Sequence, residues 1–200
     1  MRAYFASIDH GILRTLIARR FKNPSLLALC DAVLTRVPAA SGLGLPIGAL
    51  TSQWFANLYL DGFDRHLLGK APVRAMVRYM DDVVWWCGSR AEARATLDEA
   101  TRWLLEHRRL TVKPGARIAR SDQGLSFVGF RVFAGTLRLL LRRKRRYTAA
   151  RGRWESRFAR GDIDASMLQA GYASALAITH DADATGWRRA QLKRRPPVDA

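Results

Sequence analysis

Apolar positions recur with the helical period of 3.6 residues in several parts of the chain. The pattern predicts helices over four ranges: residues 11–21, 23–36, 51–68 and 89–107. Asn23 followed by Pro24 has the form of an N-cap and a first helical residue, and Ser89 with Glu92 has the spacing of a capping box. These two pairs predict where the second and fourth helices begin.

Shorter apolar stretches have the Val and aromatic content of strands. The first ten residues, MRAYFASIDH, and residues 125–133, LSFVGFRVF, are each expected to be extended. Residues 77–86, VRYMDDVVWW, predict two strands joined by a turn that holds two aspartates. Residues 110–112 and 116–120 flank the sequence Lys-Pro-Gly, which predicts another hairpin.

Charge distinguishes the last third of the chain from the rest. The 200 residues include 34 Lys and Arg against 17 Asp and Glu, a net charge of +17. Residues 138–160 hold ten Lys or Arg and one acid, with Tyr147, Trp154 and Phe158 interleaved. We therefore expect a boundary near residue 140, between a mixed α/β body and a basic helical tail. Such charge attracts polyanions, nucleic acid above all, although an Arg-rich composition also follows from a high-GC genome.

Other features narrow the class of protein. Cys30 and Cys87 lie far apart without CxxC spacing, and the four histidines show no metal-ligand spacing. The sequence shows no signal peptide, and no apolar run approaches the roughly 20 residues of a membrane span. A chain of this length buries roughly 70% of its unfolded surface and needs no disulfide staples. We expect a soluble intracellular protein whose cysteines are reduced and serve as small core residues.

The adjacent carboxylates of Asp81 and Asp82 are the first candidate for chemistry. Burying one unpaired carboxylate is costly, and two adjacent ones repel each other. Divalent cations cancel that repulsion, and two such ions about 3.5–4 Å apart can catalyse an in-line phosphoryl displacement. The alternative is an exposed acidic turn. Turns usually recruit Gly or Asn, however, whereas Tyr79, Met80 and Val83 abut these acids.

Two further segments have the composition of binding surfaces. Residues 41–53, SGLGLPIGALTSQ, run from a glycine-containing loop that begins at Pro38 into a helix, so backbone amides could approach a phosphate or a base closely. An ordinary loop is the alternative, and Ser52 and Gln53 are either capping residues or groups that face a cleft. In the basic tail, Arg with interleaved aromatics suits phosphate contacts and stacking, with a solvated helix face as the alternative.

Taken in order, five segments resemble the motifs of one family, the reverse transcriptases of the bacterial type. YFASIDH resembles the end of the first palm motif, GLPIGALTSQWFANLYLDGFD the second, and YMDD the third. The segment of residues 110–113 resembles the fourth motif, and LSFVGF resembles the primer-grip hairpin. The second motif is most similar to reverse transcriptases of diversity-generating retroelements and group II introns in Ile47, Gly48, Ser52 and Gln53. Ala49 stands where those proteins usually carry Asn.

The resemblance implies an α+β polymerase palm over residues 1–140, an antiparallel sheet packed on helices, and a partial helical thumb over residues 141–200. It implies an RNA-directed DNA polymerase of the bacterial cytoplasm that adds dNTPs to a DNA primer on an RNA template, with no membrane and a possible retroelement accessory protein. Two Mg²⁺ ions would be held by Asp81 and Asp82, the catalytic residues. Phe5 would lie under the incoming sugar, and Gly48, Ser52 and Gln53 would line the nucleotide cleft. The residues implied at the primer and template are Tyr79, Met80, Lys113, Phe127, Gly129, Arg142, Arg143, Arg145 and Arg146.

One feature departs from the family's pattern. The metal-binding aspartate of the first motif would stand immediately before Met1, and Asp9 matches a later aspartate that is not the main metal ligand. The fingers segment that normally precedes the palm is also missing. These two departures predict a chain truncated at its N-terminus, through a misassigned start or a degraded gene, with little or no activity by itself. The alternatives are a nucleic-acid-binding remnant without catalysis and another template-directed polymerase, although Phe5 argues against an RNA polymerase.

Overall fold

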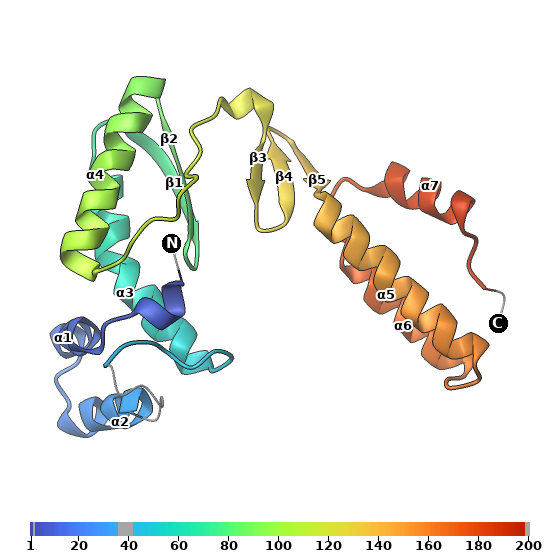
Figure 1. Cartoon of the computed structure of the whole chain (residues 1–200), viewed down its shortest axis with the longest axis horizontal. Helices are drawn as coiled ribbons and strands as arrows, with labels where there is room; N and C mark the ends of the chain where they lie inside the picture. The colour runs from blue at the N-terminus through green and yellow to red at the C-terminus, as the bar shows by residue number, and fades with distance from the viewer. Residues whose placement is uncertain (2, 36–41, 199–200) are drawn as a thin grey trace. The chain divides into compact units, whose positions relative to one another are not determined.

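The computed structural model describes residues 1, 3–35 and 42–198 and divides into two compact units, residues 1–118 and 119–200. Within the described residues there are seven α-helices and two small antiparallel sheets, which confirms the α+β class (Figure 1). The division lies between residues 118 and 119, earlier in the chain than the boundary near residue 140 that the sequence predicts. The strands of residues 125–139 therefore belong with the basic helices, because Phe130 and Leu139 share a hydrophobic cluster with Ala182 and Ala184.

Unit 1 is built around one long helix. Its elements are α1 His10–Arg20, α2 Pro24–Thr35, α3 Leu50–Leu68, β1 Val73–Tyr79, β2 Asp82–Cys87 and α4 Arg90–Arg108. Helix α3 contacts α1, α4 and β1 and buries Phe55, Tyr59 and Phe63. Trp85 of β2 packs against the same core. Each such buried side chain contributes roughly 1.5–3 kcal/mol, so this core holds the β1–β2 hairpin onto the helices.

The four helices predicted for this unit are confirmed, with described ends that differ by at most one residue from the prediction. Asn23 Oδ1 accepts a hydrogen bond from the Leu26 amide at 3.2 Å and caps α2. Ser89 Oγ accepts from the Glu92 amide at 3.1 Å, and the Glu92 carboxylate accepts from the Ser89 amide at 3.1 Å, so the capping box of α4 is present. Arg36, the predicted end of α2, and residues 38–41 of the predicted loop lie outside the described residues.

The prediction of an extended first segment was wrong. Tyr4–Ser7 form a 3₁₀ turn. Isolated backbone bonds join this region to the loop before α3, from the Leu45 amide to the Phe5 carbonyl and from the Gly44 amide to the Ile8 carbonyl, each 2.8 Å. Tyr4 is buried, and its hydroxyl donates to the Ala56 carbonyl of α3. The buried Tyr4 side chain and these backbone bonds, with an isolated antiparallel bridge between Asp9 and Leu43, therefore fix this segment without a regular strand.

The hairpin predicted around Lys113 was also wrong. The turn at Pro114 and Gly115 is present, but residues 110–112 and 116–120 form no strands. Leu110 is fully buried in the core, and its amide donates to the Leu104 carbonyl at 3.1 Å as the chain leaves α4. The apolar residues that suggested a strand therefore pack against the helices without a β partner.

Unit 2 combines a three-stranded sheet with three helices: β3 Leu125–Phe127, β4 Phe130–Phe133, β5 Thr136–Leu139, α5 Leu141–Ala159, α6 Ala165–Ala177 and α7 Thr185–Arg194. The segment predicted as one strand is a hairpin in which Phe127 pairs with Phe130. Its two turn residues, Val128 and Gly129, have φ of 45° and 83°. Positive φ at both central positions is what a tight hairpin turn requires, so Gly129 was the signal for the turn.

Helices α5 and α6 lie side by side (Figure 1), and side-chain contacts fasten the chain after α7 to them. The helical form predicted for the basic tail is thereby confirmed. Buried Glu155 is ion-paired with Arg151 at 2.7 Å and with Arg195 at 2.5 Å. Arg151 also donates to the Pro196 carbonyl at 2.8 Å, and Tyr172 accepts from the Val198 amide at 3.2 Å. A short polar network therefore ties the C-terminal segment to the helix pair.

Two remaining expectations concern cysteines and membranes. Cys30 and Cys87 are free thiols that pack against the core of unit 1, as predicted. Among the described residues, no helix combines the length and the apolar character that crossing a bilayer requires.

Candidate functional site

The two aspartates lie at the tip of the β1–β2 hairpin. Met80 and Asp81 form the two-residue turn, and Asp82 is the first residue of β2, paired with Tyr79. The predicted pair of strands is thus confirmed, with Asp82 belonging to a strand and not to the turn. Asp81 is half-buried and Asp82 is exposed.

The ladder places Asp82 on the open face of the hairpin. Paired residues of an antiparallel ladder share a face, and the faces alternate along each strand. Arg78 and Val83 form one pair on the face that packs on the core, and Asp82 shares the opposite face with Tyr79, which is 58% exposed. Asp82 is therefore open to solvent beside an aromatic ring.

The start of the chain lies beside Asp81. The nitrogen of Met1 is 3.6 Å from the Asp81 Oδ2 atom and donates a hydrogen bond to the Asp81 carbonyl at 3.3 Å. Tyr4 and Phe5 follow, with their rings edge to face at 5.7 Å. Tyr4 is hydrogen-bonded to α3, and Phe5 is hydrogen-bonded to Leu45 of the loop before α3. The first residues, this loop and the aspartate turn therefore converge in one region of unit 1.

The loop that enters α3 contributes both open and buried groups. Gly48 has φ of 96° and open space where a side chain would be, and Gln53 is exposed. Ser52 is instead buried, 1% exposed, and its Oγ has no hydrogen-bond partner among the described residues. Neither Ser52 nor Gln53 caps α3, because the N-cap is Ala49 and no side-chain hydrogen bond caps the first turn. Gln53 is thus available to a ligand, and Ser52 faces the core.

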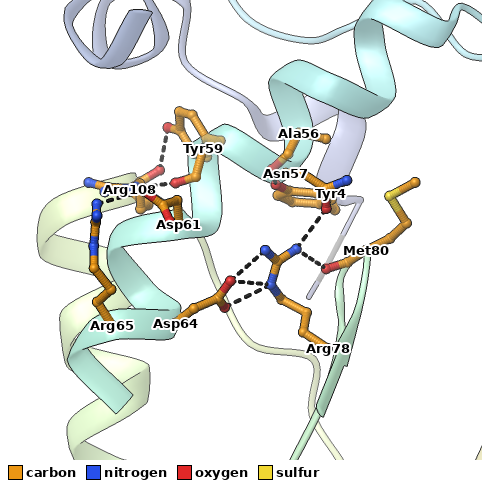
Figure 2. Close-up of polar contacts among 10 residues, drawn as sticks. All are labelled: Tyr4, Ala56, Asn57, Tyr59, Asp61, Asp64, Arg65, Arg78, Met80 and Arg108. Carbon is orange, nitrogen blue, oxygen red and sulfur yellow. Dashed lines mark hydrogen bonds and ion pairs between the residues drawn. The ribbon is translucent and has the colours of Figure 1, made fainter. Parts of the chain in front are cut away.

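Arg78 connects the aspartate turn to α3. Its guanidinium donates to Asp64 through Nε at 2.7 Å and through Nη2 at 2.5 Å. The remaining nitrogen donates to Asn57 Oδ1 at 3.0 Å and to the Met80 carbonyl at 3.2 Å. Figure 2 shows this guanidinium between the helix carboxylate and the turn carbonyl. Sequence reasoning missed Arg78 and Asp64, although a charged residue within the apolar strand was a visible signal.

A second polar network in unit 1 surrounds Tyr59, also in Figure 2. Its hydroxyl accepts from the Asp9 amide at 3.3 Å and donates to the Arg108 carbonyl at 2.7 Å. Burial raises the pKa of this hydroxyl, so it stays a neutral donor. Arg108 returns a bond from Nε to the Tyr59 carbonyl at 2.6 Å. These bonds fasten the end of α4 to α3 and to the start of α1.

Asp9 has a structural role in this network. Its carboxylate caps α1 by accepting from the Ile12 amide at 3.0 Å and is ion-paired with Arg109 at 2.7 Å. Burial alone would raise the pKa of Asp9, but the Ile12 amide and Arg109 outweigh burial and lower that pKa. A carboxylate committed to a helix cap and an arginine is not available as a metal ligand at the Asp81 turn.

The basic residues proposed from sequence divide into engaged and exposed groups. Arg143 is engaged within unit 2: its guanidinium lies 3.8 Å from the centre of the Phe130 ring and donates to the Ile178 carbonyl at 3.0 Å. Its Nε also lies against Gly129, where a Cβ would be 2.9 Å away. Phe127 is half-buried. The exposed group comprises Arg142, Arg145 and Arg146 in unit 2 and Lys113 in unit 1.

Unit 2 has a basic pocket between α5 and α6, of about 420 Å³. We call this the arginine pocket; its lining residues include Arg146, Arg153, Trp154, Arg157 and Ser174. The Arg157 guanidinium lies over the Trp154 ring at 5.2 Å, which holds both side chains in place. Sequence reasoning identified Arg146 alone of the three arginines. The signal was their spacing of seven and four residues, which places them on one face of a helix.

Comparison of the chain with models of known protein families and with curated proteins gives no match. In the described part of the chain, no group of three or more His, Cys, Asp or Glu side chains is arranged to hold a metal ion. A function therefore has to be inferred from three features: the turn that carries Asp81, the N-terminal segment that lies beside it, and the arginine pocket.

Proposed function

We propose that unit 1 is the palm of an RNA-directed DNA polymerase of the bacterial reverse transcriptase type. The observation that carries the proposal is the convergence of three segments that are distant in sequence. Met1 lies against Asp81, Tyr4 is bonded to Ala56 of α3, and Phe5 is bonded to Leu45. These are the segments that resemble the first three palm motifs, and a polymerase site requires them to lie together.

The Asp81 carboxylate would serve as a ligand for a divalent cation. It is half-buried at the tip of the β1–β2 hairpin. Carboxylate oxygens are the hard ligands that Mg²⁺ prefers. When bound, Mg²⁺ would activate the primer hydroxyl and stabilise the leaving oxygen. Asp81 would bind the cation directly, with Asp82 exposed beside it.

The other residues of this region have roles in orientation and exclusion. Phe5 would lie beneath the incoming sugar and favour deoxynucleotides by steric exclusion of a 2′-hydroxyl. Gly48 and exposed Gln53 would border the nucleotide, while Tyr79 on the open strand face would contact the primer end. Exposed Lys113 would contact the template or primer backbone. In unit 2, Arg142, Arg145 and Arg146 are exposed and suit phosphate contacts.

The test is primer extension on an RNA template with Mg²⁺ and dNTPs. Because the Met1 nitrogen is 3.6 Å from Asp81, a residue placed directly before Met1 would lie beside that carboxylate. We therefore compare two forms that are extended at the N-terminus by a fingers segment and that differ only in carrying Asp or Asn directly before Met1. The Asp form should extend primers, prefer dNTPs over NTPs and lose activity on Asp81→Asn. The Asn form and the 200-residue chain should be at least about a hundredfold slower, since removal of a catalytic ligand costs orders of magnitude.

Two results would count against the polymerase proposal. One is an Asp-extended form that incorporates no nucleotide. The other is incorporation that is unchanged by Asp81→Asn, because the activity would then not come from this turn.

A second candidate function is nucleic-acid binding without catalysis, and the arginine pocket favours it. Three arginines, a tryptophan and a serine between two helices suit a phosphodiester. Binding of a single-stranded RNA or DNA by the 200-residue chain should weaken with salt, with a logarithmic slope of about −0.7 per phosphate contact. Replacing Arg146, Arg153 and Arg157 by Gln should reduce that slope by about two units. The control pair is Arg120→Gln and Arg160→Gln, two arginines already ion-paired with Asp122 and Asp162.

If the triple variant retained the salt slope of the wild type, the arginine pocket would not be part of the nucleic-acid-binding surface. Binding that does not change between low and moderate salt would contradict this second function altogether.

A further inference from the structure

The turn that carries Asp81 has a backbone conformation that its residues do not favour. Met80 has φ of 55° at the first of the two turn positions. Glycine usually occupies such positions, because a Cβ atom comes too close to the following carbonyl oxygen there, and asparagine and aspartate are tolerated because their side chains hydrogen-bond locally. A methionine at this φ persists only where the surrounding structure holds it.

The surrounding structure that holds Met80 is the Arg78 side chain. Arg78 donates to the Met80 carbonyl at 3.2 Å, and its side chain is 12% exposed. The guanidinium is itself fixed by Asp64 with bonds of 2.7 Å and 2.5 Å and by Asn57 at 3.0 Å. Both partners belong to α3, the most buried helix of unit 1. The Arg78 guanidinium therefore connects the Met80 carbonyl of the turn to helix α3 (Figure 2).

We infer that Arg78 is a positioning residue for the Asp81 carboxylate. It fixes the carbonyl of Met80, immediately before Asp81, and thereby sets the orientation of the Asp81 side chain relative to the turn. Arg78 does not touch the cation or the substrate in this role. The inference rests on the proposed function, in which Asp81 binds a divalent cation.

Positioning and simple electrostatics predict opposite results, which makes the inference testable. A cation near a metal site repels the metal, so loss of the Arg78 charge alone would tighten binding. Loss of positioning would weaken binding. Lysine keeps the charge but cannot donate in three directions from a planar fork, so Arg78→Lys removes positioning and keeps the electrostatic repulsion.

The experiment is a Mn²⁺ titration of the 200-residue chain, with free Mn²⁺ measured by electron paramagnetic resonance. Wild type, Asp81→Asn, Arg78→Lys and Arg78→Gln are compared. Arg74→Lys and Arg74→Gln are matched controls, because Arg74 is an exposed arginine of the same strand, away from the turn. Both Arg78 variants should lower the Asp81-dependent affinity on the order of tenfold, as residues that orient metal ligands commonly do. The Arg74 variants should bind as wild type does.

Amide hydrogen exchange gives a second readout that needs no metal. The amide of Asp82 closes the turn opposite Tyr79, and the amides of Val77 and Val84 lie at the next hydrogen-bonded pair of the ladder. In Arg78→Lys the Asp82 amide should exchange at least about tenfold faster, while Val77 and Val84 keep their protection. Faster exchange along the whole hairpin would indicate loss of stability and would contradict a positioning role.

The outcomes separate this inference from the proposed function. If wild type binds Mn²⁺ through Asp81 and Arg78→Lys binds equally well, the positioning role is overturned and the metal site stands. Tighter Mn²⁺ binding by Arg78→Gln would likewise overturn the positioning role, because it would show that Arg78 acts on the site only through electrostatic repulsion. If Asp81→Asn changes no Mn²⁺ binding in any form, the metal site of the proposed function fails. The Asp82 exchange rate then decides whether Arg78 orders the turn, and an unchanged rate overturns the inference.

Discussion

Arg109 donates to the Asp9 carboxylate at 2.7 Å and so joins the end of α4 to the start of α1. The two residues are 100 positions apart in sequence. Asp9 also caps α1, and its pKa is lowered because the Ile12 amide and Arg109 together outweigh the effect of burial. One carboxylate therefore contributes both to a local helix cap and to a long-range contact of unit 1.

The Asp9 contact gives the stability of unit 1 a defined pH dependence. A carboxyl whose pKa is lower in the folded state adds stability that is complete well above its ordinary pKa of 3.8 and is lost as pH falls through the lower folded value. Asp9→Asn keeps the cap but not the charge. It should destabilise the chain by up to about 1 kcal/mol at pH 7, because Arg109 is largely exposed. Urea unfolding from pH 7 to pH 3 should show this difference shrinking below pH 4.

Asp9→Ala provides the comparison for the cap. It removes the side-chain acceptor as well as the charge, and it should cost about 1–2 kcal/mol at pH 7. A difference between wild type and Asp9→Asn that grows on acidification would show that the pKa of Asp9 is not lowered on folding.

Tyr59→Phe should destabilise unit 1 by about 1–3 kcal/mol. The buried hydroxyl donates to the Arg108 carbonyl at 2.7 Å and accepts from the Asp9 amide at 3.3 Å. Its removal leaves two backbone groups unpaired. Tyr79→Phe is the matched control, since Tyr79 is 58% exposed, and it should change unfolding by less than about 0.5 kcal/mol. Equal effects of the two substitutions in urea unfolding would show that the Tyr59 network does not stabilise the fold.

The elements set by local sequence were predictable, and the Asp9 and Tyr59 contacts show what was not. Helical periodicity, the Asn23 cap and the Ser89 capping box depend on residues within four positions of one another. The strand pair around Asp81 followed from its Val and aromatic content. In contrast, Tyr4–Ser7 became a 3₁₀ turn because Tyr4 is anchored to Ala56, which no local pattern records.

The candidate site was predictable to the same extent. The acidic pair was visible as charge within an apolar strand, and α5 was visible as a basic helix. The Arg78 contacts with Asp64 and Asn57 depend on how β1 packs on α3, so sequence spacing could not predict them. Arg143 shows the same limit: it was expected from a basic run to bind ligand, and its packing on Phe130 inside unit 2 is a contact that the sequence did not predict.

Gly171→Ala should destabilise unit 2 by about 1–3 kcal/mol through overpacking. A Cβ at this position of α6 would lie 2.3 Å from Cδ2 of Trp154, so the ring would have to move away from the helix. The matched control is Gly186→Ala in α7, where the added Cβ meets nothing within 4 Å. This control should be neutral or stabilising by up to about 1 kcal/mol, because alanine is the better helix former. Thermal unfolding of both variants measures the difference, and a neutral Gly171→Ala would mean that α5 and α6 do not pack closely.

Val128→Asn should stabilise unit 2 by about 1 kcal/mol. Val128 has φ of 45° in the β3–β4 turn, and a left-handed conformation costs an L-residue with a side chain roughly 1–2 kcal/mol. Asparagine tolerates this region, and Asn-Gly is the preferred pair for a two-residue hairpin turn. Val128→Ile keeps the strain and should give no gain, while Val132→Asn places an amide against the hydrophobic cluster of this unit and should destabilise it. Thermal unfolding in which Val128→Asn melts no higher than wild type would show that packing of the valine, and not its backbone strain, dominates at this turn.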